Sequence, residues 1–398
     1  MGCEKVDTMK NVLFSLCFTL ANPALAQVDQ GPPNTGFTPA FAGQTRAPAL
    51  TATNVLVEPF VTGLENPWGI ATLPGGGWLV TERPGRMRLI GADGTLSEPI
   101  TGLPQVAAIE QGGLLDVAIA PDFATSRIIW WTYAKPLSNG FVTAAARGVL
   151  SPDGTQLTDV QDMFVQDPPS LVPAHYGSRV VFDGQGHVFI TTGEHFTDAN
   201  RLLAQDLTTT YGKVIRLTET GSVPADNPYV GIGGDDQIWS YGHRNIQGAA
   251  INPATGALWT IEHGPQGGDE LNQPGPELNY GWPLVSYGEN YDGSPVGSGA
   301  SRMEGVQEPV YYWDPVIAPG GMLFYQGNFA DWQGDVLIAS LNPGALVRLK
   351  LDAGRVIGEE RLVTDVGRVR DAEALANGGL LLLIDATDGG ILRVTPQP

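Results

Sequence analysis

Apolar runs of strand length recur along the chain, and short turns rich in Gly, Pro, Asp or Asn separate them. Alternating or fully apolar runs bounded by such turns are typical of β-strands. No long stretch carries a helical period with capping residues. The pattern therefore predicts an all-β protein. Its clearest repeats, with turns such as PGGG, PDF, DGQG, NPATG and ANGG, begin at Trp68, Leu114, Arg179, Gly248, Gly321 and Ala372.

Six repeats of this size, built from strands, indicate a six-bladed β-propeller of four-stranded antiparallel blades. Residues 55–398 supply enough chain for that architecture. A pair of β-sandwiches is the alternative, but the repeat crosses the midpoint of the chain without a linker. In a propeller the loops at one end of the blades converge on the central channel, so residues far apart in the sequence can share one site.

The N-terminal residues have a different pattern. Lys10 precedes an apolar run at residues 11–20, and Ala24-Leu25-Ala26 has the form of a signal-peptidase cleavage site. The run is too short to span a bilayer, and its flanks favour a signal peptide at residues 1–26 over a buried strand. We therefore expect a periplasmic protein without a membrane span; a secreted protein would carry the same segment. Residues 27–54, rich in Pro, Thr, Gly and Ala, are expected to form a linker or a loosely ordered N-terminal arm.

Composition narrows the range of partners. The chain of 398 residues has 22 basic and 42 acidic side chains and a net charge of −20. Such a balance disfavours nucleic acid and anionic membranes as partners. Both cysteines, Cys3 and Cys17, lie in the predicted signal peptide, so the mature chain is expected to have no disulfide.

Two polar residues flank the third repeat. His175 lies just before its first strand, with Gly177 and Ser178 leaving space around the imidazole, and Glu194 follows the second strand. Two antiparallel strands can bring this carboxylate to the imidazole, and a histidine held in this way can accept a proton from an alcohol. A solvent-exposed loop histidine is the simpler interpretation of His175 taken alone.

Arginines and amides open the fourth and sixth repeats. Arg244, Asn245 and Gln247 precede or begin the fourth, and Arg368 and Arg370 begin the sixth. Guanidinium and amide groups suit a planar ligand with several anionic or carbonyl groups. Arg368 and Arg370 would project on the same side of an extended strand. Structural pairing with the many acidic residues is the alternative.

The segment EHGPQGGDELN at residues 262–272 follows a strand-like run and combines three glycines with acidic residues. Glycine lets a backbone approach a ligand closely, and carboxylate and carbonyl oxygens suit calcium. The absence of cysteine from the mature chain disfavours zinc. A solvated hairpin tip is the simpler interpretation of this segment. The acidic residues in and after it are Asp269, Glu270, Glu289, Asp292 and Glu308.

From about residue 57 to the end, the order of these motifs resembles the soluble pyrroloquinoline quinone (PQQ)-dependent glucose/sorbosone dehydrogenase family, with the aldose sugar dehydrogenase branch nearest. The motifs are QGGLL at 111–115, PDF at 121–123, HYGSR at 175–179, GHRNIQG at 242–248, EHGPQGGDE at 262–270, NYGWP at 279–283 and RVR at 368–370.

The resemblance implies a propeller that binds PQQ through calcium at the mouth of its channel. It implies that His175 is the general base and that Glu194 orients it. It implies contacts to PQQ or substrate from Gln111, Arg244, Asn245, Gln247, Asn342, Arg368 and Arg370. The catalytic calcium would be held by the backbone carbonyls of Gly264 and Pro265, and a second, structural calcium by Glu270, Tyr280, Tyr287 and Glu308.

The chain departs from the family pattern at two positions. Asn342 stands where the family usually has a lysine that supplies positive charge to the quinone, and Val316 replaces a hydroxyl residue typical of the glucose enzymes. Weaker cofactor binding, altered redox chemistry or compensation by the arginines would follow.

The expected reaction is oxidation of an aldose at its anomeric hydroxyl to a lactone, with hydride transfer to PQQ and reoxidation by an external electron acceptor. A calcium-dependent propeller hydrolase, such as a lactonase, and a non-catalytic binding propeller are the alternatives.

Overall fold

The computed structural model describes residue 1 and residues 26–397, so the predicted signal peptide lies almost wholly outside the described residues. The described chain forms six sheets, which we number as blades in chain order. Blade 1 contains β2 (Pro67–Thr72), β3 (Trp78–Glu82) and β4 (Arg86–Ile90). Blade 2 contains β5 (Leu114–Ile119), β6 (Ile128–Leu137), β7 (Gly140–Leu150) and β8 (Leu157–Val165). Blade 3 contains β9 (Gly177–Phe182), β10 (His187–Thr192), β11 (Lys213–Thr218) and β12 (Ile238–Tyr241).

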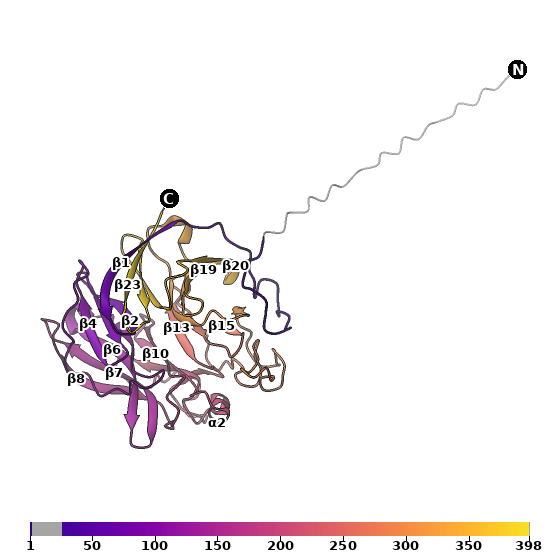
Figure 1. Cartoon of the computed structure of the whole chain (residues 1–398). Helices are drawn as coiled ribbons and strands as arrows, with labels where there is room; N and C mark the ends of the chain where they lie inside the picture. Colours follow the sequence, from indigo (N-terminus) through magenta and orange to yellow (C-terminus); the bar gives the residue numbers. More distant parts are fainter. Residues whose placement is uncertain (2–25, 398) are drawn as a thin grey trace.

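The remaining blades complete the ring. Blade 4 contains β13 (Ile246–Ile251), β14 (Leu258–Glu262), β15 (Asp269–Asn272) and β16 (Tyr311–Trp313). Blade 5 contains β17 (Pro319–Phe324), β18 (Val336–Ser340), β19 (Ala345–Asp352) and β20 (Arg355–Leu362). Blade 6 contains β21 (Val369–Ala374), β22 (Leu380–Ile384), β23 (Gly389–Pro396) and β1 (Val55–Leu64). The first strands of successive blades contact one another in a closed cycle, β2, β5, β9, β13, β17, β21 and back to β2. The predicted six-bladed propeller is confirmed (Figure 1).

The two ends of the chain close the ring together. β1 pairs antiparallel with β23, from Val55 opposite Pro396 to Leu64 opposite Gly389, so the strand that starts the propeller is the outer strand of blade 6 (Figure 1). In blade 1, a single bridge between Ile90 and Leu96 takes the place of a fourth strand in register.

Helical structure is short and lies in the connections. The helices are α1 (Phe123–Ser126), α2 (Asp198–Arg201), and the 3₁₀-helices η1 (Leu202–Gln205) and η2 (Ala330–Trp332). Across residues 26–397 there is no helix with the length and apolar character needed to cross a membrane.

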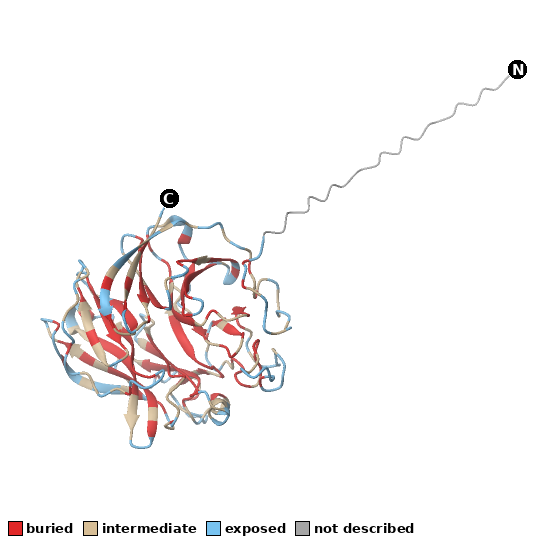
Figure 2. Cartoon of the chain, in the orientation of Figure 1, coloured by how far each residue is buried: buried red, intermediate tan, exposed pale blue. Residues whose placement is uncertain are grey.

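The core lies between the blades. Each pair of neighbouring blades encloses a cluster of buried apolar side chains, for example Trp259 of β14 with Ile338 of β18, and Trp131 of β6 with Leu79 of β3. Both faces of a blade are therefore covered, which explains why many strands are apolar throughout instead of alternating. Figure 2 shows the buried residues concentrated on the strands, with exposed residues on the loops.

The N-terminal arm is held against blades 4 and 5, although its composition indicated a linker or a loose segment. The carboxylate of Asp314 accepts hydrogen bonds from the backbone N–H groups of Asn34 and Thr35, both at 2.9 Å, from Asn34 Nδ2 at 2.9 Å and from Thr35 Oγ1 at 2.8 Å. Ala49 bridges in parallel to Glu359 of β20. Polar contacts to the propeller, which composition does not reveal, fix this segment.

Candidate functional site

A cavity of about 180 Å³ lies at the end of the ring where the inner strands begin and the second strands of the blades end. Antiparallel pairing places both strand ends of a blade at the same edge, and the ring brings these edges together around the channel. Seven predicted site residues line it: Gln111, His175, Arg244, Asn245, Gln247, Arg368 and Arg370. The structure therefore brings together residues from blades 2, 3, 4 and 6.

His175 and Glu194 form a buried pair beside this cavity. His175 Nδ1 lies 3.2 Å from Glu194 Oε1, and the other carboxylate oxygen accepts a hydrogen bond from the backbone N–H of Phe196. The backbone N–H of His175 donates to Gln111 Oε1 at 2.9 Å. No hydrogen bond to His175 Nε2 occurs within residues 26–397. A proton on Nδ1 that donates to Glu194 leaves Nε2 as the unprotonated nitrogen, available to accept a proton.

The electrostatics favour this protonation state. Burial, together with the positive charge of Arg244, lowers the pKa of His175 despite the opposing effect of Glu194. For Glu194, burial alone favours the neutral acid. The charge of His175, its hydrogen bond, the charge of Arg244 and the Phe196 N–H outweigh burial and lower the pKa of Glu194. At neutral pH the pair is a neutral imidazole beside a carboxylate.

A second histidine, His263, also lines the cavity, but its Nε2 already has a hydrogen-bond partner. Its Nε2 lies 2.7 Å from the carbonyl oxygen of Pro319, to which it donates. Burial, with the charge of Arg244, lowers the pKa of His263 to about 3. Within residues 26–397, no carboxylate is hydrogen-bonded to this ring, so His175 is the better candidate for the base.

The cavity is strongly cationic. Four arginines line it, Arg83, Arg244, Arg368 and Arg370, and none of its lining residues is acidic. Asp385 lies behind Arg368 and Arg370, at 3.3 and 3.1 Å from their Nη2 atoms. Burial, partly offset by Asp385, lowers the pKa of Arg370 to about 10, so its guanidinium stays charged at neutral pH. Positive charge held in a partly desolvated cavity favours an anionic ligand.

Several buried donors in this cavity lack a partner. Within the described chain, Arg244 Nε, Arg370 Nε and the hydroxyl of Tyr176 are buried without a hydrogen bond. Buried polar groups are normally satisfied, so unsatisfied ones call for an explanation. A bound molecule with several carboxylate and carbonyl oxygens would supply acceptors, and PQQ is such a molecule. The residues present therefore fit this cofactor.

Amide groups organise the floor of the cavity. Asn245 Oδ1 accepts from the backbone N–H of Gly177 at 3.0 Å and from Gln247 Nε2 at 3.2 Å. Gln247 Oε1 accepts from Arg370 Nη1 at 2.9 Å. These bonds join blades 3, 4 and 6, so Asn245 and Gln247 fix the positions of neighbouring groups.

Sequence reasoning did not identify every lining residue. The lining residues to which it assigned no contact with a ligand are Trp68, Arg83, Leu115, Tyr176, Gly177, His263, Tyr291 and Leu341. Trp68 lies near the start of β2, and Arg83 and His263 directly follow β3 and β14. These residues lie at the same strand ends as His175 and Glu194 do in blade 3. Comparing the same positions in every repeat would have found them.

Asn342 is exposed and does not line the cavity, whereas its neighbour Leu341 does. The backbone N–H of Asn342 lies 3.4 Å from the carbonyl oxygen of Ile317. In this conformation the amide of Asn342 does not replace the charge of a lysine at the cavity, and that charge comes from the arginines.

The loop after β14 presents carbonyl oxygens toward the same region. Arg244 Nη1 donates to the carbonyl oxygen of Gly264 at 2.7 Å and to that of His263 at 3.2 Å. Buried Asp269 holds the loop by accepting from the Gly264 N–H at 2.7 Å. Pro265 lines an adjoining cavity of about 390 Å³ that shares Arg244 and Tyr291 with the first. Two neutral carbonyls are a partial ligand set for calcium, so an anionic ligand would have to complete it.

Among the residues expected at a second calcium, Tyr287 and Glu308 are in direct contact. Tyr287 donates its hydroxyl hydrogen bond to Glu308 Oε2 at 2.5 Å, and Gln44 of the N-terminal arm donates to the same oxygen at 3.0 Å. Burial and the charges of Glu262, Glu308 and Asp269 raise the pKa of Glu270 well above its usual range. A cation would relieve this repulsion among carboxylates.

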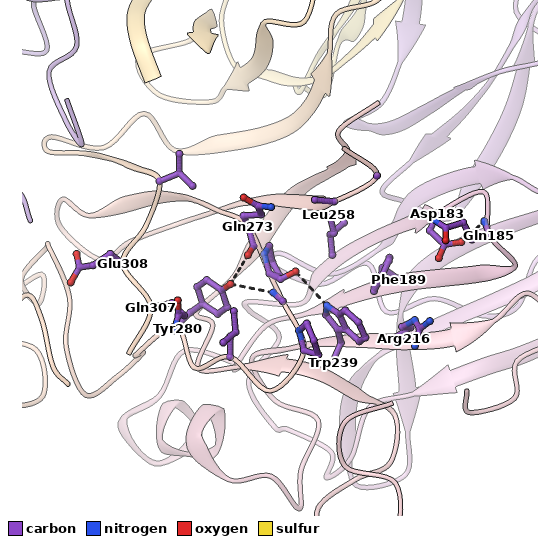
Figure 3. Close-up of a pocket in the computed structure, with 17 residues that line it drawn as sticks. Asp183, Gln185, Phe189, Arg216, Trp239, Leu258, Gln273, Tyr280, Gln307 and Glu308 are labelled. Atoms are coloured by element: carbon purple, nitrogen blue, oxygen red, sulfur yellow. Dashed lines mark hydrogen bonds between the residues drawn. The ribbon is translucent and has the colours of Figure 1, made fainter. Parts of the chain in front are cut away.

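The described residues do not present a preformed cage of three or more His, Cys, Asp or Glu side chains for a metal. Tyr280 and Glu308 line a larger cavity of about 620 Å³ between blades 3 and 4 (Figure 3). Figure 3 shows Trp239, Arg216 and Asp183 of blade 3 on the other side of this space. Neither His175 nor any of the four arginines of the smaller cavity lines it, so cavity size alone does not identify the candidate active site.

Comparison with known proteins identifies related sequences. Residues 64–393 match the model of the family described as Glucose / Sorbosone dehydrogenase. Aldose sugar dehydrogenase YliI of Escherichia coli K12 is 42% identical over 357 residues, covering 88% of this chain and 94% of the relative. Quinoprotein glucose dehydrogenase B of Acinetobacter calcoaceticus is 26% identical over 395 residues, covering 79% and 82%.

Solved structures agree with these sequence comparisons. The apo-form crystal structure of the soluble aldose sugar dehydrogenase of Escherichia coli superposes with a TM-score of 0.84 at 41% identity, covering 86% of this chain and 100% of that structure. The PQQ-bound form of the aldose sugar dehydrogenase of Streptomyces coelicolor gives a TM-score of 0.72 at 27% identity, covering 87% and 99%.

Proposed function

This chain belongs to the glucose/sorbosone dehydrogenase family, and on that premise we propose that it oxidises the anomeric hydroxyl of aldose sugars to lactones with bound PQQ. The observation that carries the proposal is the position of His175, with its Nδ1 paired to Glu194, at the edge of a cavity lined by four arginines and no acidic residue. A base thus stands beside a site that suits a polyanionic cofactor.

His175 is the general base of the proposed reaction. Its Nε2 accepts the proton of the anomeric hydroxyl as hydride leaves the anomeric carbon. Glu194 holds the Nδ1 tautomer and stabilises the imidazolium that forms. Positioned acid–base catalysis of this kind contributes about 10²–10⁴-fold to a rate.

The arginines and amides bind the cofactor. PQQ supplies the two-electron acceptor when it is bound. Arg244, Arg368 and Arg370 place positive charge where its carboxylates and reduced ring oxygens would lie, which stabilises negative charge that develops there. Asn245 Nδ2, which has no protein acceptor within residues 26–397, is a further donor to the bound molecule.

Calcium fits the loop after β14 in this proposal. The carbonyl oxygens of Gly264 and Pro265 would hold it, and it would polarise a cofactor carbonyl as a Lewis acid. Arg244 Nη1 donates to the Gly264 carbonyl, so calcium would use the second lone pair of that oxygen or displace the guanidinium from it. Glu270, Tyr280, Tyr287 and Glu308 would hold a second calcium. Export to the periplasm and reoxidation by an external acceptor are part of the same proposal.

Reconstitution tests the function. The purified mature chain is titrated with PQQ in the presence of calcium or of a chelator, and dye reduction is followed with several aldoses. We expect cofactor absorbance changes on binding and sugar-dependent dye reduction that requires both PQQ and calcium. Binding without turnover of any aldose would favour a binding propeller, and calcium-dependent lactone hydrolysis without PQQ would favour a hydrolase.

A further inference from the structure

All six inner strands of the propeller meet at one buried guanidinium, that of Arg179 on β9. Its Nη1 lies 2.9 Å from Asp116 Oδ1 of β5 and 2.9 Å from Asp371 Oδ2 of β21. Its Nε donates to the carbonyl oxygen of Gln247 on β13 at 2.6 Å. Its Cζ lies 4.4 Å from the ring centroid of Trp68 on β2.

The remaining inner strand, β17, contributes a glycine. A Cβ on Gly321 would lie 2.8 Å from Arg179 Nη2 and would collide with the Asp371 carboxylate. The absence of a side chain at this position leaves room for the guanidinium. Arg179 itself is 5% exposed.

Two of the groups that Arg179 contacts also form the floor of the proposed catalytic cavity, the one lined by His175 and four arginines. Trp68 and Gln247 line that cavity, and Arg179 does not. Gln247 Oε1 holds Arg370 Nη1 at 2.9 Å, and the Arg370 guanidinium lies 5.6 Å from the Trp68 ring centroid. Arg179 therefore contacts two residues, Trp68 and Gln247, that in turn contact Arg370, the arginine that would bind the cofactor.

We propose that Arg179 is a positioning residue for cofactor binding, which sets the Trp68 ring and the Gln247–Arg370 pair through its contacts with the inner strands. The inference rests on the proposed function. In this proposal one guanidinium aligns cavity residues that come from separate blades. A displacement of the floor would weaken cofactor binding, because hydrogen bonds to a rigid planar ligand require fixed donors.

A second arginine provides a matched control. Arg348 of β19 is also buried and also bonds two carboxylates, Asp335 at 2.7 Å and Glu360 at 2.6 Å. It donates to the carbonyl oxygen of Asp331 at 3.1 Å and lies 5.7 Å from the Trp332 ring centroid. Its surroundings are like those of Arg179, but none of its partners lines the catalytic cavity.

Arg179→Lys and Arg348→Lys are the test variants. Lysine keeps a positive charge between two carboxylates, but it cannot also donate along the Nε direction or lie flat over an indole. Both variants are expected to lose stability. Only Arg179→Lys is expected to weaken PQQ binding, by about ten-fold or more in Kd, and to alter the absorbance spectrum of bound PQQ.

The experiment titrates each full-length mature chain with PQQ and calcium and measures Kd, spectrum and thermal stability. A raised Kd confined to Arg179→Lys supports the inference. Equal Kd values, an equal loss in both variants, or a loss confined to Arg348→Lys overturns it. If Arg179→Lys does not fold, Asp371→Asn and its control Asp335→Asn are judged by the same criterion. Failure of the unaltered chain to bind PQQ would instead contradict the proposed function.

Discussion

His175 Nδ1 lies 3.2 Å from Glu194 Oε1, and both side chains are buried. Both residues lie at the open end of the β9–β10 hairpin, since His175 precedes β9 and Glu194 follows β10. The hairpin register, with Thr192 opposite Gly177, brings them together. A local β-structure thus builds the base and the group that orients it.

The first prediction concerns pH. Because burial and Arg244 lower the pKa of His175, the acid limb of kcat/KM should fall below the usual histidine value of about 6.5. Glu194→Gln removes the carboxylate that raises this pKa, so the limb should move to lower pH while the plateau rate falls. A pH profile of both proteins checks this. A limb that moves to higher pH in the variant would contradict the assigned pairing.

The second prediction separates the two arginines of blade 6. The Arg370 side chain is 8% exposed and that of Arg368 is 52% exposed, and both lie near the same Asp385 carboxylate. Charge interactions are less screened when buried, so Arg370→Gln should weaken PQQ binding more than Arg368→Gln. Equilibrium titration of both variants measures the difference. The reverse order would show that the exposed guanidinium makes the principal contact.

The third prediction concerns the calcium loop. A Cβ at Gly264 would collide with the carbonyl oxygens of Gly267 and Gly268, so Gly264→Ala forces the loop backbone to move. We expect it to raise the calcium concentration needed for half-maximal reconstitution and to cost about 1–3 kcal/mol in stability. Gly36→Ala, at a position with open space around the added Cβ, is the control. Unchanged calcium dependence in Gly264→Ala would argue against carbonyl ligation by this loop.

The fourth prediction concerns the N-terminal arm. Because Asp314 accepts four hydrogen bonds from Asn34 and Thr35, Asp314→Asn should lower the free energy of unfolding by about 1–3 kcal/mol. Urea denaturation measures this loss. Asp331→Asn, at an exposed aspartate whose carboxylate makes no hydrogen bond within residues 26–397, should have little effect. Equal stability of the two variants would mean that the arm contributes little.

The sequence predicted the repeats and the fold, because strand periodicity and turn residues are local signals. It also predicted seven of the residues that line the catalytic cavity, from polar motifs at the repeat boundaries and from the family resemblance. It did not predict the junction at Arg179, since the partners Asp116 and Asp371 lie 63 and 192 residues away in sequence. Buried ion pairs of this kind depend on which strands become neighbours. The docking of the arm on Asp314 was missed for the same reason: its composition is that of a linker, and its bonding partners lie about 280 residues further along the chain.

The most direct test of the account is single-turnover reduction of bound PQQ by an aldose in His175→Ala. His263→Gln serves as the control, because glutamine can still donate to the Pro319 carbonyl that His263 Nε2 contacts. The account predicts that both variants bind PQQ, that His175→Ala reduces it about 10²–10⁴-fold more slowly, and that His263→Gln keeps most of the rate. Full-speed reduction in His175→Ala with PQQ bound would contradict the assignment of the base.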